Sequence, residues 1–96
     1  MVKNLNVKVV DLDGVAVTEA GKELTVGDCA VKALLAQTKQ DQSPEDKMQC
    51  YELAKKIKSV PIACDLKSEE ITKIKEKIGA YFIPVVVGFC FTELEK

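Results

Sequence analysis

The spacing of apolar residues changes once along this chain of 96 residues, close to Thr25. Before that point, apolar and polar residues alternate from Leu5 to Leu12, a pattern typical of a half-buried strand. Beyond it, apolar residues recur at intervals of three and four, which indicates amphipathic helices. The change in spacing predicts an α+β fold in which strands come first and helices follow.

A tight turn is expected at Asp13 and Gly14, which stand between apolar residues. An Asp-Gly pair in this context is a strong hairpin signal, because a two-residue primed turn needs positive φ at both positions. The returning strand would cover residues 15–18, and residues 19–22 would form a second turn or a loose loop. The sequence therefore predicts an antiparallel β-hairpin over about residues 5–18, packed on an apolar surface that stabilises it.

Four helices are expected after the hairpin, and the first three have recognisable beginnings. Thr25 or Asp28 caps the first, and Ser43 followed by Pro44 is a sharp start signal for the second. Ser68 is the expected cap of the third helix, with two glutamates directly after it. The approximate ranges of the four helices are 26–38, 44–58, 68–78 and 84–94.

The C-terminal third carries one stop signal and one ambiguous segment. Gly79 is a typical residue to end the third helix. Residues 81–94 fit a helix or a strand: the three valines at 85–87 favour a strand, whereas Pro84 fits a first helical position and the apolar residues after it share one helical face. We predict a helix there, and therefore a single domain over residues 1–96 in which the hairpin packs on three to four helices.

All 14 basic residues are lysines, and the chain has no arginine, histidine or tryptophan. Without histidine there is no imidazole to act as a general base or a metal ligand near neutral pH. Without arginine there is no guanidinium fork for guanine or phosphate. A formal net charge of −1 also supplies little of the phosphate neutralisation that drives nucleic-acid binding. We therefore expect no nucleic-acid partner.

A regulator that binds nucleic acid through lysine-rich faces is kept as an alternative. These faces lie at residues 55–58 and 73–77 of two expected helices. Glu52 precedes Lys56 by four residues, and Glu69 precedes Lys73 by the same interval, which is the spacing of ordinary ion pairs on a helix surface. A solvated helix face is the favoured interpretation of both runs.

The four cysteines are spread along the chain with no closely spaced pair. No export signal or long apolar run accompanies them, so we expect reduced, mostly buried thiols in a cytoplasmic protein without a membrane span. Zinc sites need closely spaced ligand pairs, so we expect no metal and no other cofactor. Cys29, in the first turn of its helix, is the best candidate for a reactive thiol, although core packing is favoured. The cysteines are Cys29, Cys50, Cys64 and Cys90.

The segment V-V-D-L-D-G-V at residues 9–15 resembles the first motif of the haloacid-dehalogenase-type phosphatases. The resemblance implies that Asp11 would be the phosphoryl-accepting nucleophile and Asp13 the general acid–base, with Mg²⁺ shielding the phosphate charge. The later acidic motif of that family has no counterpart in this chain. A hairpin turn is the favoured interpretation, and a Mg²⁺-dependent phosphate hydrolase is kept as an alternative.

An apolar cluster rich in phenylalanine lies close to the C-terminal end of the chain. It forms either part of the core or an exposed docking patch. The open edges of the hairpin are a second candidate contact surface, since an unpaired edge accepts another strand. The candidate interaction patch consists of Phe82, Val86, Phe89 and Phe91.

Several segments are similar, in kind and order, to those of a group of small phage and prophage proteins. These segments are V-K-V-V-D-L-D-G, T-V-G-D-C-A-V-K-A-L-L-A-Q, Y-E-L-A-K-K-I, S-E-E-I-T-K-I-K-E-K-I-G and P-V-V-V-G. The resemblance implies a small cytosolic accessory protein, and it carries no catalytic residues. We therefore expect a non-catalytic accessory or assembly factor that binds a protein partner or a second copy of itself.

Overall fold

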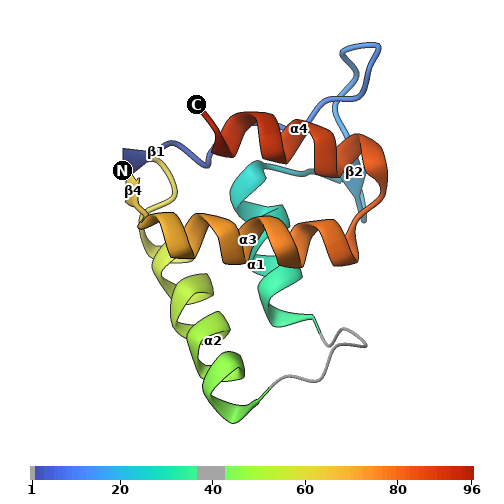
Figure 1. Cartoon of the computed structure of the whole chain (residues 1–96). Helices are drawn as coiled ribbons and strands as arrows, with labels where there is room; N and C mark the ends of the chain where they lie inside the picture. The colour runs from blue at the N-terminus through green and yellow to red at the C-terminus, as the bar shows by residue number, and fades with distance from the viewer. Residues whose placement is uncertain (1, 37–42) are drawn as a thin grey trace.

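The computed structural model describes residues 2–36 and 43–96. Within these residues the chain forms four helices and two short antiparallel sheets, so the predicted α+β fold is confirmed. Figure 1 shows α1 near the centre, with α2 on one side and α3 and α4 lying next to each other. The helices are α1 (Val26–Leu35), α2 (Pro44–Ser59), α3 (Ser68–Tyr81) and α4 (Pro84–Leu94).

A capping box starts α1. The Thr25 hydroxyl accepts a hydrogen bond from the Asp28 N–H at 3.1 Å, and the Asp28 carboxylate accepts one from the Thr25 N–H at 3.2 Å. Thr25 is therefore the cap, and Asp28 completes it. The helix ends at Leu35, since the backbone of Ala36 is already extended at ψ 142°. The predicted end at residue 38 is wrong because the chain leaves the helix at Ala36; residues 37 and 38 themselves lie outside the described residues.

The start of α2 confirms its predicted cap. The Ser43 hydroxyl accepts a hydrogen bond from the Asp46 N–H at 3.1 Å, and Pro44 occupies the first helical position. The helix extends to Ser59, one residue beyond the predicted end. The predicted helix over residues 84–94 is also confirmed as α4, again with proline first.

Two signals in α3 were misassigned. Ser68 is the first helical residue and not the cap, because the Glu70 carboxylate accepts a hydrogen bond from the Lys67 N–H at 2.9 Å and places the cap one residue earlier. Gly79 does not end the helix, which continues to Tyr81. A Cβ at Gly79 would lie 3.7 Å from the ring of Phe91, so this glycine lies beneath an aromatic side chain of α4.

Two-residue strands make both sheets. β1 (Val2–Lys3) pairs with β4 (Cys64–Asp65), and β2 (Thr18–Glu19) pairs with β3 (Lys22–Glu23). The turn between β2 and β3 consists of Ala20 and Gly21, with φ angles of 53° and 80°. Positive φ at both central residues is what a primed two-residue turn requires. The turn type expected for Asp13 and Gly14 is thus found at Ala20 and Gly21.

The predicted hairpin is built into a three-segment arrangement. The Val9 N–H donates to the Leu24 carbonyl at 2.8 Å, Leu24 donates to Val17 at 2.9 Å, and Val17 donates back to Val9 at 2.9 Å. The segment that contains Val9 is therefore hydrogen-bonded on both of its edges, to Val17 on one and to Leu24 on the other. The prediction of open hairpin edges is wrong at this point, because residues that directly precede α1 occupy the second edge. Regular pairing is limited to bridges at Lys8–Thr25 and Val10–Ala16.

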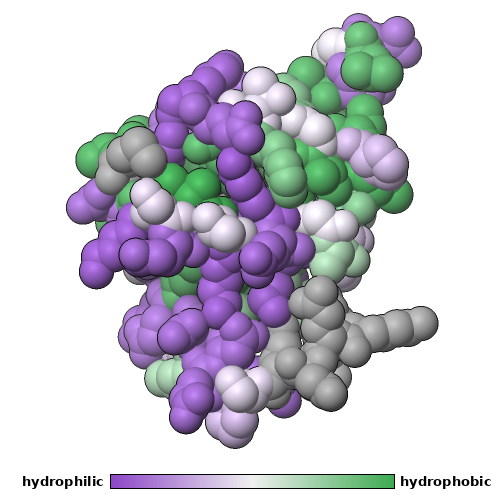
Figure 2. Space-filling model, in the orientation of Figure 1, coloured by the Kyte–Doolittle hydropathy of each residue, from purple (hydrophilic) through white to green (hydrophobic). Residues whose placement is uncertain are grey.

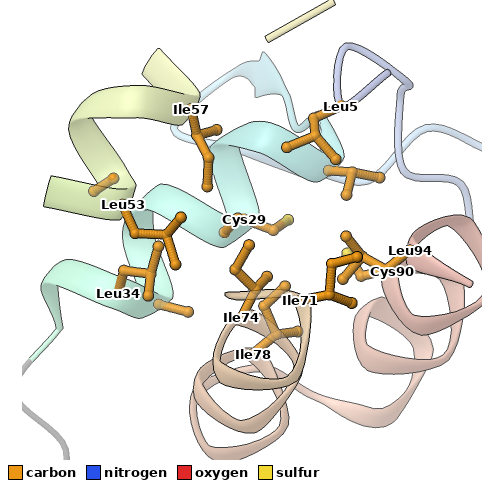
Figure 3. Close-up of a cluster of buried hydrophobic side chains, with 14 of the residues drawn as sticks. Leu5, Cys29, Leu34, Leu53, Ile57, Ile71, Ile74, Ile78, Cys90 and Leu94 are labelled. Atoms are coloured by element: carbon orange, nitrogen blue, oxygen red, sulfur yellow. The ribbon is translucent and has the colours of Figure 1, made fainter. Parts of the chain in front are cut away.

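One apolar core joins all four helices and the N-terminal segment. Figure 3 shows side chains from each of these parts directed to a common centre, among them Leu5, Ile57, Ile74 and Leu94. The residues of α1 that face its neighbours include small ones such as Ala33, which allow close approach of α2 and α3. Within residues 2–36 and 43–96, no helix has the length and apolar character needed to cross a membrane.

Candidate interaction surface

The segment Asp11–Val15, here called the hairpin tip, projects from the body of the molecule. In Figure 1 it is the blue loop that rises beyond α4. The Gly14 N–H donates to the Asp11 carbonyl at 3.0 Å, and the Asp11 N–H donates to the Val15 carbonyl at 2.9 Å. Gly14 has a φ of 79°, whereas Asp13 does not have positive φ. The tip is therefore a three-residue loop closed by glycine, and the predicted two-residue turn is wrong.

The side chain of Asp11 holds the tip in shape. Its Oδ1 atom accepts hydrogen bonds from the N–H groups of Asp13 at 2.9 Å and Val15 at 3.0 Å. These bonds satisfy two loop donors and restrict the backbone between them. Asp11 thus has a structural role in the turn, a role the sequence assigned to Asp13 and Gly14.

Leu12 is the apolar residue at the end of this loop. It is 96% exposed, the largest value among the exposed large apolar residues, and Val15 beside it is 61% exposed. Figure 2 shows apolar and hydrophilic surface together at the end of the projection. The tip presents a leucine between two aspartates on a backbone that its own hydrogen bonds hold. Sequence analysis missed Leu12, although a leucine inside D-x-D-G is an uncommon choice for an exposed turn.

The predicted interaction patch does not form one exposed surface. Val86 is 2% exposed and lies on the same face of α4 as the buried residues Cys90 and Leu94. It therefore belongs to the core, because helical spacing turns it inward. Phe82, Phe89 and Phe91 are half-buried and pack against the core.

Phe91 helps to join α4 to α3. The Nζ atom of Lys75 lies 5.7 Å from the centroid of its ring, within the range of a cation–π contact. Lys75 also forms an ion pair with Glu95 at 3.0 Å. This part of the predicted patch therefore contributes to packing between the last two helices.

The cysteines lie in the core, as the favoured interpretation expected. The Cys29 thiol of α1 and the Cys90 thiol of α4 are hydrogen-bonded and fully buried. This hydrogen bond and burial raise the pKa of the Cys29 thiol. Burial also raises the pKa values of Cys50 and Cys64. Because thiolates are the nucleophilic form, the raised pKa values of Cys29, Cys50 and Cys64 disfavour reactivity. The hydrogen bond with Cys29 lowers the pKa of Cys90, but that thiol is fully buried.

The lysines of α3 are paired with carboxylates on other elements. Asp46 of α2 forms ion pairs with Lys73 and, at 3.4 Å, with Lys77. Lys56 pairs with Glu70 at 3.2 Å. The expected pairs within one helix, from Glu52 and Glu69, are not found among the described residues, because the facing helix supplies carboxylates in better positions.

A surface concavity of about 750 Å³ lies between α2 and α3. Charged side chains of both signs line it, and the Lys56–Glu70 ion pair lies among them. The lining contains four glutamates and three lysines, so the groove has a small net negative charge. Among the described residues, no three cysteine, aspartate or glutamate side chains gather closely enough to hold a metal ion.

A smaller concavity of about 340 Å³ lies between α1 and α2 and is called the α1–α2 hollow. Its apolar part includes Leu35 and Tyr51, which are 56% and 52% exposed. The two lysines that line it have no ion-pair partner within residues 2–36 and 43–96. The full lining is Val31, Leu35, Tyr51, Ala54, Lys55, Lys58 and Ser59.

Comparison with protein-family models, with curated proteins and with solved structures gives no match for this chain.

Proposed function

We propose that this protein is a non-catalytic binding factor that docks onto another protein through the hairpin tip, with Leu12 as the anchor. The observation that carries the proposal is the 96% exposure of Leu12 on a loop that Asp11 holds by two hydrogen bonds. Burying a leucine side chain contributes about 1.5–3 kcal/mol. A loop that is already ordered also loses less conformational entropy on binding than a mobile one.

The cellular role belongs to the same proposal. A small cytoplasmic accessory or assembly factor of the phage type is consistent with the segments that resemble phage and prophage proteins. Such a factor needs a contact surface and no catalytic machinery. The hairpin tip supplies a surface of this kind at the periphery of the molecule (Figure 1).

The first test compares capture of a partner from bacterial lysate by three proteins. Leu12→Ser removes the anchor, and Ile62→Ser is the matched control because Ile62 is also well exposed, at 63%. We expect the same stoichiometric partner with wild type and Ile62→Ser, and about ten-fold less or none with Leu12→Ser. Equal recovery of the partner with Leu12→Ser would contradict the role of Leu12.

The second test separates binding from the phosphate-hydrolase alternative. Because one oxygen atom of Asp11 accepts both loop hydrogen bonds, an asparagine at this position can accept them as well. We expect Asp11→Asn to retain partner binding and Asp11→Ala to weaken it. A Mg²⁺-dependent hydrolase would instead lose activity with Asp11→Asn, since the amide removes the nucleophile. Such an activity, measured on a phosphate ester, would favour the alternative.

The alternative that the protein binds nucleic acid through its lysine-rich faces is tested by a separate measurement. The ion pairs of Lys56, Lys73 and Lys75 within the molecule reduce the charge available to phosphates. Binding through the lysine faces would weaken steeply as salt concentration rises, and a titration with duplex DNA at several salt concentrations detects this.

A further inference from the structure

We infer that one partner of the hairpin tip is a second copy of this chain, with Leu12 of one copy seated in the α1–α2 hollow of the next. The inference rests on the proposed function, since it uses the same anchor. It predicts head-to-tail association, in which each copy offers a tip to one neighbour and a hollow to another.

The two surfaces are complementary in charge and in apolar character. The tip places the carboxylate of Asp13 beside Leu12, and within the described residues this carboxylate has no ion-pair partner. The hollow places Lys55 and Lys58 beside apolar side chains, and these lysines are likewise unpaired within the described part of the chain. Docking would bring the Asp13 carboxylate close to these two ammonium groups while covering exposed apolar surface on both sides.

The hollow has a suitable size and lining for a single leucine. Its volume of about 340 Å³ leaves room for a leucine side chain. Leu35 and Tyr51 provide half-exposed apolar walls, and Ala54 is a buried, small residue in the lining. The α2–α3 groove is lined by four glutamates and three lysines, so its net negative charge would repel the Asp13 carboxylate and makes that larger concavity a poorer fit.

The placement of the two surfaces favours a heterologous contact. In Figure 1 the hairpin tip and α2 lie at opposite ends of the molecule, whose longest dimension is 39 Å. A tip therefore cannot reach the hollow of its own chain. Successive copies can instead repeat the contact, each tip docking in the hollow of the next copy. Heterologous contacts of this kind form rings when the rotation closes and filaments when it does not.

The contact is small, so we expect association to be weak and to appear at high protein concentration. A projecting loop in a shallow hollow buries less than the roughly 1,200 Å² that separates stable interfaces from transient ones. The weight-average mass of the wild type, measured by sedimentation at concentrations up to about 1 mM, should rise with concentration. Leu12→Ser should shift this rise to about ten-fold higher concentration, and Ile62→Ser should not.

Mixing two defective variants gives the decisive experiment. Leu12→Ser has a defective tip and an intact hollow. The double variant Lys55→Glu, Lys58→Glu has an intact tip and a defective hollow. At concentrations at which the wild type associates, each variant alone should remain largely monomeric, whereas the mixture should form 1:1 dimers that grow no further. Because all three positions are exposed, both variants should fold, and circular dichroism checks this.

Charge reversal provides a second, independent measurement. Asp13→Lys should abolish self-association, and combining it with Lys55→Glu and Lys58→Glu in one chain should restore it. Failure of both the mixture and the triple variant to associate would overturn the inference.

The result also separates this inference from the proposed function. A wild type that stays monomeric, together with capture of a lysate protein that depends on Leu12, would overturn self-association and leave the binding role standing. A wild type that stays monomeric and captures no lysate protein through Leu12 would overturn both the inference and the proposed function.

Discussion

Ala20 is the only non-glycine residue with positive φ in the described part of the chain. The left-handed conformation brings the Cβ of an L-residue close to the backbone and costs about 1–2 kcal/mol, except for glycine and, to a smaller degree, asparagine. The turn between β2 and β3 nevertheless needs positive φ at both Ala20 and Gly21, because only two residues join the strands. The strain at Ala20 is therefore set by the length of the turn.

Replacing Ala20 by asparagine should relieve part of this strain. We expect Ala20→Asn to raise the free energy of unfolding by about 0.5–1 kcal/mol, since asparagine tolerates the left-handed region better than alanine. Urea denaturation followed by circular dichroism measures the change. Ala63→Asn, at an exposed position without positive φ, is the control and should give no gain. A loss of stability with Ala20→Asn would show that the alanine is not strained.

At the scale of secondary-structure elements, a carboxylate joins α2 to α3. Asp46, in the first turn of α2, forms ion pairs with Lys73 and Lys77 of α3. Gln49 of α2 accepts a further hydrogen bond from Lys73 at 2.9 Å. The side chain of Lys77 is only 6% exposed, so Asp46 supplies a charge partner for a nearly buried ammonium group. Removing that partner would leave Lys77 poorly compensated.

The stability contributed by Asp46 should depend on pH. The hydrogen bond from Lys73 holds the pKa of this carboxyl below its usual value of 3.8. A lowered folded-state pKa gives stability that is fully present above the usual value and is lost as the pH falls through the lowered one. At neutral pH we expect the free energy of unfolding of the wild type to exceed that of Asp46→Asn by about 1–2 kcal/mol. This difference should disappear in acid, at pH values below the usual pKa of the carboxyl group.

Denaturation of both proteins at a series of pH values from 7 down to about 2 measures this difference. Asp13→Asn is the control, because Asp13 is exposed at the hairpin tip and has no ion pair within the described residues. It should lie within about 0.5 kcal/mol of wild type at neutral pH. A difference between wild type and Asp46→Asn that stays constant into strong acid would rule out the ion pairs as its source.

At the scale of the whole molecule, the core closes over all four thiols. Cys29 and Cys90 are each fully buried, and their contact joins α1 to α4. Cys50 and Cys64 are buried from α2 and β4. Access of a reagent to any of these sulfur atoms therefore requires the structure to open.

Thiol alkylation should consequently report on unfolding of the domain. We expect iodoacetamide at pH 8 to modify the native protein at least about a hundred-fold more slowly than the protein in guanidinium, where all four thiols are exposed. Mass spectrometry of quenched samples gives the number of modified cysteines with time. One thiol that reacts rapidly under native conditions would identify an accessible cysteine and contradict the packing described for it.

Local sequence patterns were enough to predict the presence of the four helices, the strands that precede them and a turn near Gly14. Helix positions follow from local information, such as the Ser43-Pro44 start and the apolar spacing, which act within a few residues. The type of each turn could not be predicted from this local information. Pairing of Val9 with Leu24, a residue distant in sequence, sets the register, and the register makes a three-residue loop at Gly14 and a two-residue turn at Ala20.

Which apolar residues are covered depends on tertiary packing and could not be predicted from local patterns. Leu12 and Val86 are both branched aliphatic residues, yet Leu12 is 96% exposed and Val86 is 2% exposed. The difference arises because α4 packs its Val86 face into the core, whereas the hairpin tip, held in shape by the hydrogen bonds of Asp11, projects from the body of the molecule. Local sequence sets backbone preferences and faces, but burial depends on what the rest of the chain brings against each face.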